Sequence, residues 1–147
     1  MDQDARRRLL EQAISILDGK DTLIVVPMDE FFDGNTDEGC IGVNLPPDWH
    51  IGLAGYRSLF DGIRQRPDVQ EVFIELTEVP YPDDEDEADL WPVGCVAFVI
   101  TSAPLEEVEK WVEPIHPREV AEGWHTREGV ETPSVNDQMR PVRVWLL

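Results

Sequence analysis

The chain has 147 residues and carries 31 Asp and Glu against 12 Lys and Arg, which gives a formal net charge of −19 at pH 7. This charge disfavours binding to nucleic acid, because phosphate contacts need a basic surface, and it disfavours anionic membrane surfaces for the same reason. An apolar fraction of 41% with five tryptophans excludes a disordered acidic polypeptide. The length predicts one domain, residues 1–147, around one core.

Neither a secretory signal nor a membrane span is expected. The first residues lead into an amphipathic stretch instead of an apolar run with a cleavage site, and no apolar run approaches the roughly 20 residues that span a bilayer. Cys40 and Cys95 both lie in apolar runs, which predicts buried, reduced thiols; a disulfide between them and a reactive thiol are the alternatives. These features predict a cytoplasmic protein.

The negative charge is concentrated in two spans of the chain. No Lys or Arg lies between Lys20 and Arg57 or between Arg66 and Lys110, and these spans contain 7 and 13 acidic residues. Unpaired negative charge on a compact body repels itself and attracts cationic partners or cations. We therefore expect acidic surfaces that face a positively charged partner.

In chain order, residues 2–17 carry apolar side chains at helical spacing and predict an amphipathic helix. Residues 22–28 are rich in β-branched side chains and predict a short strand. The acidic residues 29–38 are expected to form a loop that leads to a weaker strand over residues 40–44. Together the two strands would form a hairpin.

Residues 48–66 predict a second helix, with Asp48 at its cap and apolar side chains three and four positions apart. Residues 69–79 alternate between apolar and polar side chains, which is typical of a half-buried strand. After a loop over residues 80–89, residues 93–100 are almost wholly apolar. Such a strand is covered on both faces or is central in its sheet.

A third helix is predicted to begin at Pro104 and to end by Pro114. The polar residues 117–139 are expected to be irregular, apart from one helical turn at residues 118–122. Residues 142–147 predict a final strand, since an apolar chain end is normally held in a sheet.

This order of elements predicts an α+β fold, with a single-layer, mainly antiparallel sheet of four to five strands and helices packed on it. Without the first helix and the second strand, the order is β-α-β-β-α-β. That order allows a ferredoxin-like, split β-α-β arrangement with an extra N-terminal helix.

No catalytic signature occurs in the sequence. It lacks a Gly-x-Ser-x-Gly motif, a phosphate loop and a Gly-x-Gly-x-x-Gly motif. The only histidines are His50, His116 and His125, whose spacing matches no compact metal pair. His50 is expected in the capping region before a helix. We therefore predict no catalytic residue and no cofactor.

The first acidic segment has three alternative interpretations. Asp33, Asn35 and Asp37 place oxygen side chains at alternate positions, as calcium-binding loops do. However, the glycine falls one position late, and Asn44 stands where such a loop has its closing glutamate. The segment is therefore a metal site at these three residues, an acidic loop that binds a partner, or a solvated connection.

The second acidic segment has six carboxylates in seven positions, and these repel one another into water. Aromatic residues flank it, and amphipathic aromatics beside charge are common on recognition surfaces. The predicted partner-binding residues are Asp83, Asp84, Glu85, Asp86, Glu87, Asp89, Tyr81 and Trp91. The alternative is a hydrated hairpin tip whose aromatics anchor it to the body.

The five tryptophans fall into two groups by their surroundings in the sequence. Trp111 lies on the apolar stripe of a predicted helix and Trp145 in the terminal strand, which predicts core positions for both. Trp49, Trp91 and Trp124 lie beside proline, glycine or charge. One or more of these three is expected to make a surface contact.

The leading hypothesis is a non-enzymatic binding or inhibitor protein whose acidic loops engage a basic protein partner, since complementary charge speeds association and selects partners. In composition the chain resembles the immunity proteins that neutralise basic toxins, and this resemblance implies an inhibitor role. One alternative is a divalent-metal-binding protein or enzyme that uses the loop from Asp29 to Glu38. Another is a structural component that self-associates through a sheet edge.

Overall fold

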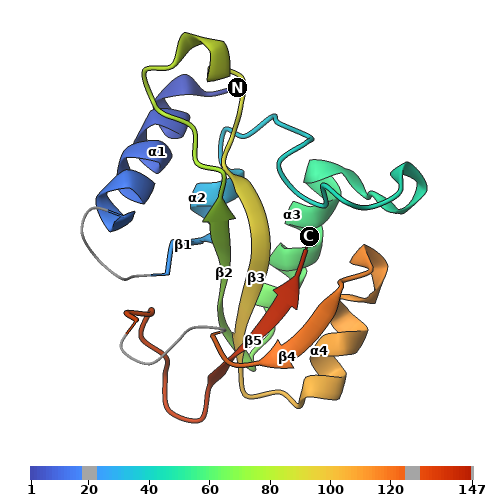
Figure 1. Cartoon of the computed structure of the whole chain (residues 1–147). Helices are drawn as coiled ribbons and strands as arrows, with labels where there is room; N and C mark the ends of the chain where they lie inside the picture. The colour runs from blue at the N-terminus through green and yellow to red at the C-terminus, as the bar shows by residue number, and fades with distance from the viewer. Residues whose placement is uncertain (18–22, 125–129, 147) are drawn as a thin grey trace.

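A five-stranded antiparallel sheet forms the centre of the molecule (Figure 1). The computed structural model describes residues 1–17, 23–124 and 130–146. The sheet has the order β1-β2-β3-β5-β4. Its strands are β1 (Val25–Pro27), β2 (Val69–Thr77), β3 (Val93–Thr101), β4 (Glu119–Glu122) and β5 (Arg140–Trp145).

Four α-helices accompany the sheet, and the predicted α+β class is confirmed. They are α1 (Gln3–Leu17), α2 (Met28–Phe32), α3 (Gly52–Arg64) and α4 (Leu105–Trp111). Single 3-10 turns lie at Pro47–Trp49, Glu85–Glu87 and Glu113–Ile115. Of the helices that the structure describes, none is both long enough and apolar enough to cross a membrane.

One face of the sheet carries all four helices. Side chains alternate between the two faces of a strand, and Ile74, Ala97 and Val144 lie in register across β2, β3 and β5 on this face. Each of the three is fully buried. Apolar side chains from all four helices pack on them, among them Leu9, Phe31, Phe60 and Val108.

The opposite face is covered by the chain near the C-terminus. Phe73 and Phe98 lie in register on this face, and the ring of Trp124 packs 4.9 Å from that of Phe98. Val135 and Met139 complete the cover. β3 is therefore central and buried on both sides, as its continuous apolar sequence predicts.

The ferredoxin-like order is not what the sheet adopts. In a split arrangement a third strand separates the two strands of the first β-α-β unit, whereas here β1 pairs directly with β2, with Val26 opposite Ile74 in antiparallel register. The connection between β1 and β2 contains two helices, α2 and α3. The first of them, α2, begins at Met28 directly after β1.

The strand predicted for residues 40–44 is wrong, and so is the hairpin built on it. Only one isolated parallel bridge forms, between Ile41 and Gly94. Gly42 adopts a left-handed backbone conformation (φ +64°), and its carbonyl accepts a hydrogen bond from the N–H of Leu45. The chain therefore turns where a strand would continue.

The helical turn predicted for residues 118–122 is also wrong, because this segment forms β4. Its backbone pairs with β5, with Val120 opposite Val144. Arginines of β5 bind its two glutamates, with Arg140 at 2.9 Å from Glu122 and Arg143 at 3.4 Å from Glu119. Tertiary pairing outweighs local preference here.

The two cysteines are free and buried, on opposite faces of the sheet. Burial raises the pKa of the Cys40 thiol to about 12. Burial also raises the pKa of Cys95, and so does the Glu75 carboxylate, which accepts a hydrogen bond from Cys95 Sγ at 3.0 Å. Both thiols therefore stay protonated in the folded protein.

These thiols predict a loss of stability at alkaline pH. An unfolded cysteine ionises near pH 9.0, whereas folded Cys40 keeps its proton up to about pH 12, so unfolding releases protons between these values. The free energy of unfolding should fall with rising pH in this window, by up to about 1.4 kcal/mol per pH unit for each thiol. Urea denaturation of the wild type and of the Cys40→Ala/Cys95→Ala variant measures it. A decline of equal slope in both proteins would contradict this assignment.

Candidate functional site

The loop between β2 and β3 (residues 78–92) lies at the same end of the molecule as the start of α1 (Figure 1). Its tip is ordered by its own side chains. The Asp84 carboxylate accepts a hydrogen bond from the backbone N–H of Asp86 at 3.0 Å and so caps the 3-10 turn Glu85–Glu87. Repulsion among the carboxylates is thus partly offset by local capping.

Arg6 of α1 holds this loop through its backbone. The Arg6 side chain is buried, with the residue 3% exposed, and it donates to the carbonyl of Leu90 at 2.8 Å and to that of Glu87 at 2.6 Å. Gln3 adds a bond to the carbonyl of Ala88 at 3.1 Å. The arginine therefore fixes the shape of the loop without neutralising any of its carboxylates.

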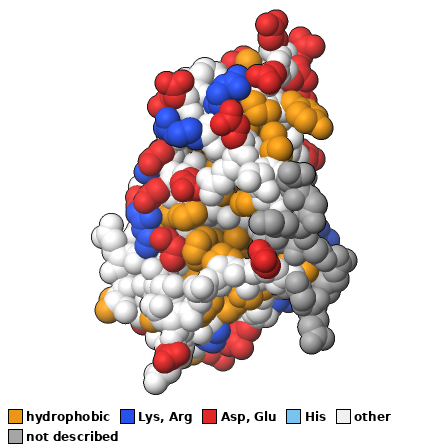
Figure 2. Space-filling model, turned by 90° about the vertical axis from the view of Figure 1, so that its left-hand side faces the viewer, with side chains coloured by type: hydrophobic (Ala, Val, Ile, Leu, Met, Phe, Trp, Pro, Cys, Tyr) orange, Lys and Arg blue, Asp and Glu red, His pale blue; other side chains and the backbone are white. Residues whose placement is uncertain are grey.

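Most of the carboxylates in the loop point into solvent. Arg7 pairs with Asp83 at 3.1 Å. Four other acidic residues are exposed and make no ion pair with any residue that the structure describes: Asp84, Glu85, Asp86 and Asp89. Figure 2 shows acidic side chains gathered at the top of the molecule, the end at which this loop lies.

Two large apolar side chains are exposed beside these carboxylates. Tyr81 is 73% and Leu90 49% exposed. Trp91, which was predicted with Tyr81 as an aromatic contact residue, is only 2% exposed, and its backbone N–H donates to the Asp37 carboxylate at 3.0 Å. That prediction is wrong, because Trp91 anchors the loop in the core; Leu90, which charge patterning did not single out, is exposed instead.

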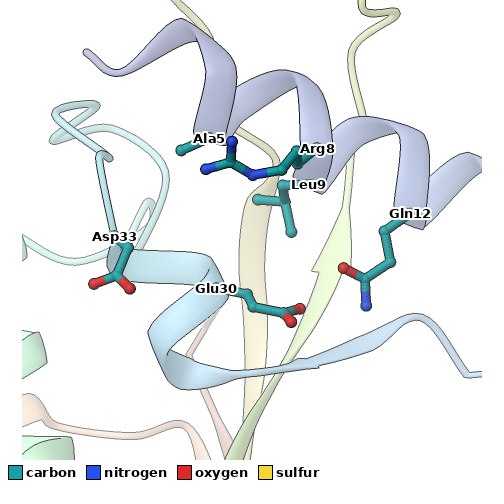
Figure 3. Close-up of a pocket in the computed structure, with 6 residues that line it drawn as sticks. All are labelled: Ala5, Arg8, Leu9, Gln12, Glu30 and Asp33. Atoms are coloured by element: carbon teal, nitrogen blue, oxygen red, sulfur yellow. The ribbon is translucent and has the colours of Figure 1, made fainter.

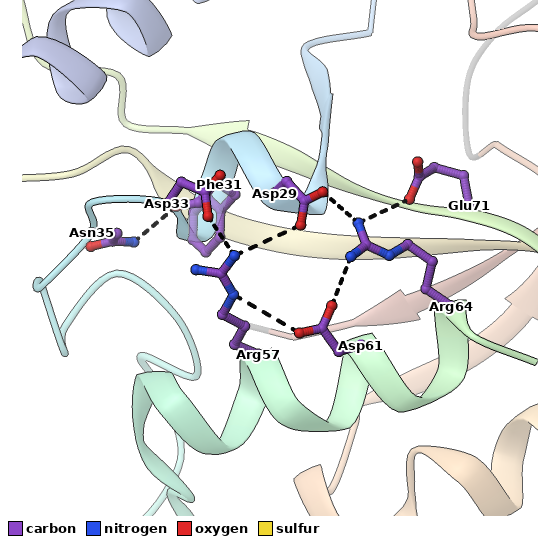
Figure 4. Close-up of polar contacts among 8 residues, drawn as sticks. All are labelled: Asp29, Phe31, Asp33, Asn35, Arg57, Asp61, Arg64 and Glu71. Atoms are coloured by element: carbon purple, nitrogen blue, oxygen red, sulfur yellow. Dashed lines mark hydrogen bonds and ion pairs between the residues drawn. The ribbon is translucent and has the colours of Figure 1, made fainter.

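The first acidic segment is not a loop, since it contains α2, and its carboxylates meet arginines from α3 (Figure 4). Arg57 binds Asp33. Arg64 lies 2.8 Å from both Asp29 and Asp61. The hydrogen bond to Asp29 raises the pKa of Arg64 and keeps it cationic. Bases from outside the base-free span therefore pair with two of the carboxylates in this segment, Asp29 and Asp33.

The predicted metal ligands are engaged within the chain. Besides the Asp33 ion pair, Asn35 donates to the carbonyl of Phe31 at 3.2 Å and accepts from the N–H of Asp37 at 2.9 Å. Asp37 accepts from the N–H of Gly39 as well as from that of Trp91. Across residues 1–17, 23–124 and 130–146, no three His, Cys, Asp or Glu side chains are placed to hold a metal. These contacts give the metal hypothesis no support.

A hollow of about 220 Å³ lies between α1 and α2 (Figure 3). Arg8 and Gln12 of α1 line one side of it, and Glu30 and Asp33 line the other. No hydroxyl, thiol or imidazole is among its lining side chains. The polar groups of the hollow are therefore a guanidinium, an amide and two carboxylates.

His50 is in the capping region before α3, as predicted. Its Nδ1 accepts from the N–H of Gly52 at 3.0 Å, and its Nε2 lies 2.8 Å from the carbonyl of Ile41. Both ring nitrogens are thus used by the backbone. His116 stacks on Trp49 with ring centroids 4.4 Å apart, and His125 lies outside the described residues.

Together, fold and contacts define an α+β protein whose sheet is packed with helices on one face and whose most distinctive surface is an ordered acidic loop. A family model described as "Uncharacterized protein YfbO family" matches residues 4–144, and the chain belongs to this family. Uncharacterized protein YfbO of Escherichia coli (strain K12) is 35% identical over 125 residues, which cover 82% of this chain and 81% of that protein. No solved structure matches.

The anchoring role of Arg6 predicts a specific effect of its removal. Arg6→Met keeps the apolar stem but leaves the carbonyls of Glu87 and Leu90 without a donor, and the free energy of unfolding should fall by about 1.5–3 kcal/mol. Amide hydrogen exchange should accelerate in residues 85–90. Arg7→Met is the control, because Arg7 makes only exposed contacts and should cost less than about 1 kcal/mol. Equal losses in the two variants would contradict the anchoring role.

The ion pairs between α2 and α3 predict a salt-dependent loss. Arg64→Gln removes the cation that separates Asp29, Asp61 and Glu71, so the protein should lose about 1–2 kcal/mol of stability at low salt. The loss should shrink when NaCl screens the remaining carboxylates. Lys110→Gln changes the net charge equally at an exposed pair and should be nearly neutral. A loss that is unchanged between low and high salt would count against this explanation.

Proposed function

We propose that this protein is a non-enzymatic binding protein that engages a basic protein partner through the loop at residues 81–90. One observation carries the proposal. Arg6, a buried cation, binds the carbonyls of the loop, and four of its exposed carboxylates make no ion pair within the described residues. Arg6 lies beside the loop, but its guanidinium binds backbone carbonyls and none of these four carboxylates.

The shape of the loop supports this role. A loop that is already ordered in the free protein loses less conformational entropy on binding. Exposed Tyr81 and Leu90 supply apolar area beside the carboxylates, and tyrosine is frequent among residues that dominate binding energy. The loop thus combines steering by charge with an apolar anchor.

The structure also narrows the choice between the two acidic segments. In residues 29–38, Asp29 and Asp33 pair with Arg57 and Arg64, so part of the charge of this segment is offset within the molecule. Among the described residues, the loop at residues 81–90 has one ion pair, from Arg7 to Asp83. An inhibitor role of the immunity type follows if the partner uses its basic surface to bind its own substrate.

Self-association through a sheet edge is less well supported. The edge strands β1 and β4 have three and four residues, and both glutamates of β4 are held by arginines of β5. Short, charged edges discourage pairing with a second sheet.

The test is binding to a panel of small basic proteins by biolayer interferometry, with the variant Asp84→Asn/Glu85→Gln/Asp86→Asn/Asp89→Asn. Binding to the true partner should weaken at least about tenfold in this variant, and it should weaken further between about 50 and about 300 mM NaCl in the wild type.

The matched control is Glu106→Gln/Glu109→Gln/Glu131→Gln/Asp137→Asn, which removes the same charge from other exposed positions. It should retain most of the affinity. If the two quadruple variants bind alike, net charge and not this loop determines binding. If the affinity of the wild type for the partner does not change with NaCl concentration, an electrostatic contact through this loop is refuted.

A further inference from the structure

The hollow between α1 and α2 has a defined shape (Figure 3). Its apolar lining comes from Ala5 and from Leu9, which is 3% exposed and belongs to the core. The chain directly before α1 is tied to the turn after α2, since the N–H of Asp2 donates to the carbonyl of Gly34 at 2.9 Å. A Cβ on Gly34 would lie only 2.6 Å from that of Asp2. This close contact holds the two walls of the hollow together at one end.

Oppositely charged side chains face each other across this hollow without pairing. Arg8 of α1 and Glu30 of α2 both line it, and both are exposed. Neither side chain makes a hydrogen bond or an ion pair with any residue that the structure describes. In Figure 3, Arg8 and Gln12 extend from α1 on one side, and Glu30 and Asp33 lie on the other. One unpaired cation and one unpaired carboxylate thus border the same small space.

An arginine without a partner is unusual in a chain with 12 bases and 31 acids. Among the Lys and Arg side chains that the structure describes, only those of Arg8 and Arg118 make neither an ion pair nor a hydrogen bond. Of these two, Arg8 lines the hollow together with two carboxylates. The width of the hollow, and not a shortage of carboxylates, therefore leaves Arg8 without a partner.

The free charges of the hollow cancel. Its second carboxylate, Asp33, is paired with Arg57 of α3. This leaves one charge of each sign, on Arg8 and on Glu30. Glu30 repels a ligand that has only a carboxylate, and Arg8 repels a ligand that has only an ammonium group. A ligand that carries both groups satisfies the two sides at once.

The size and the lining of the hollow limit the ligand further. Its volume of about 220 Å³ is below the roughly 300–1,000 Å³ of sites for drug-sized ligands, so the occupant has few atoms. Ala5 and Leu9 offer apolar area to its methylene groups. The amide of Gln12 both donates and accepts hydrogen bonds, so it suits either charged end.

We propose that this hollow binds a small amino acid in its zwitterionic form. The carboxylate of the ligand pairs with Arg8, whose planar guanidinium matches carboxylate geometry. The ammonium group pairs with Glu30, and the carbon chain between the two groups lies on Leu9. This site is separate from the loop at residues 81–90 and does not rest on the function proposed for that loop.

The experiment is an NMR titration of the ¹⁵N-labelled protein with glycine, L-alanine, β-alanine and γ-aminobutyrate. Sodium acetate and methylammonium chloride are the singly charged comparisons. At least one amino acid should shift the backbone amides of Ala5, Leu9 and Asp33 saturably, with a Kd of about 1 mM or tighter. Neither singly charged compound should saturate up to about 20 mM. No saturation with any of the four amino acids, or equal binding of acetate or methylammonium, would overturn the proposal.

Matched variants locate the binding. Arg8→Met and Glu30→Gln should each weaken it at least about tenfold, and both should unfold at the same urea concentration as the wild type, because these side chains make no contact within the described chain. Arg118→Met and Glu106→Gln make the same charge changes at exposed positions outside the hollow and should bind like the wild type.

The quadruple variant of the acidic loop separates this site from the proposed function. Asp84→Asn/Glu85→Gln/Asp86→Asn/Asp89→Asn should bind the amino acid with the affinity of the wild type, whether or not it has lost the basic protein partner. Full affinity in Arg8→Met or Glu30→Gln, or an equal loss in the matched controls, would refute the site.

Discussion

Arginine side chains that bind oxygens of distant segments hold this tertiary structure together. Arg6 joins α1 to the β2–β3 loop, Arg64 joins α3 to α2, and Arg140 joins β5 to β4. With 12 bases against 31 acids, the excess of negative charge follows from composition. The positions of the bases decide only where on the surface that excess remains.

This constraint separates two acidic segments that look alike in composition. The one around α2 packs against α3, so its carboxylates meet Arg57 and Arg64 and contribute to the fold. The loop at residues 81–90 binds Arg6 through its backbone carbonyls, so most of its carboxylates remain available. The proposed partner contact is therefore placed on the second segment.

Elements with strong periodicity could be predicted from the sequence, and those that depend on distant partners could not. Helices α1, α3 and α4 and strands β2 and β3 follow from apolar spacing, because spacing decides which side chains can be buried on one face. The order of the strands, the strand character of Glu119–Glu122 and the burial of Trp91 required the fold. Trp91 is held by Asp37, 54 positions earlier, and no local pattern shows that pairing.

For the two acidic segments, too, one part could be predicted from the sequence and another part depended on the fold. The sequence by itself determined the excess of negative charge and the two spans without Lys or Arg, since composition cannot change on folding. Only the tertiary structure decided which carboxylates meet a base, because an arginine offsets a carboxylate only within a few ångströms. Packing of α2 against α3 creates that proximity for Asp29 and Asp33, and the outward turn of residues 83–89 denies it to Asp84, Glu85, Asp86 and Asp89.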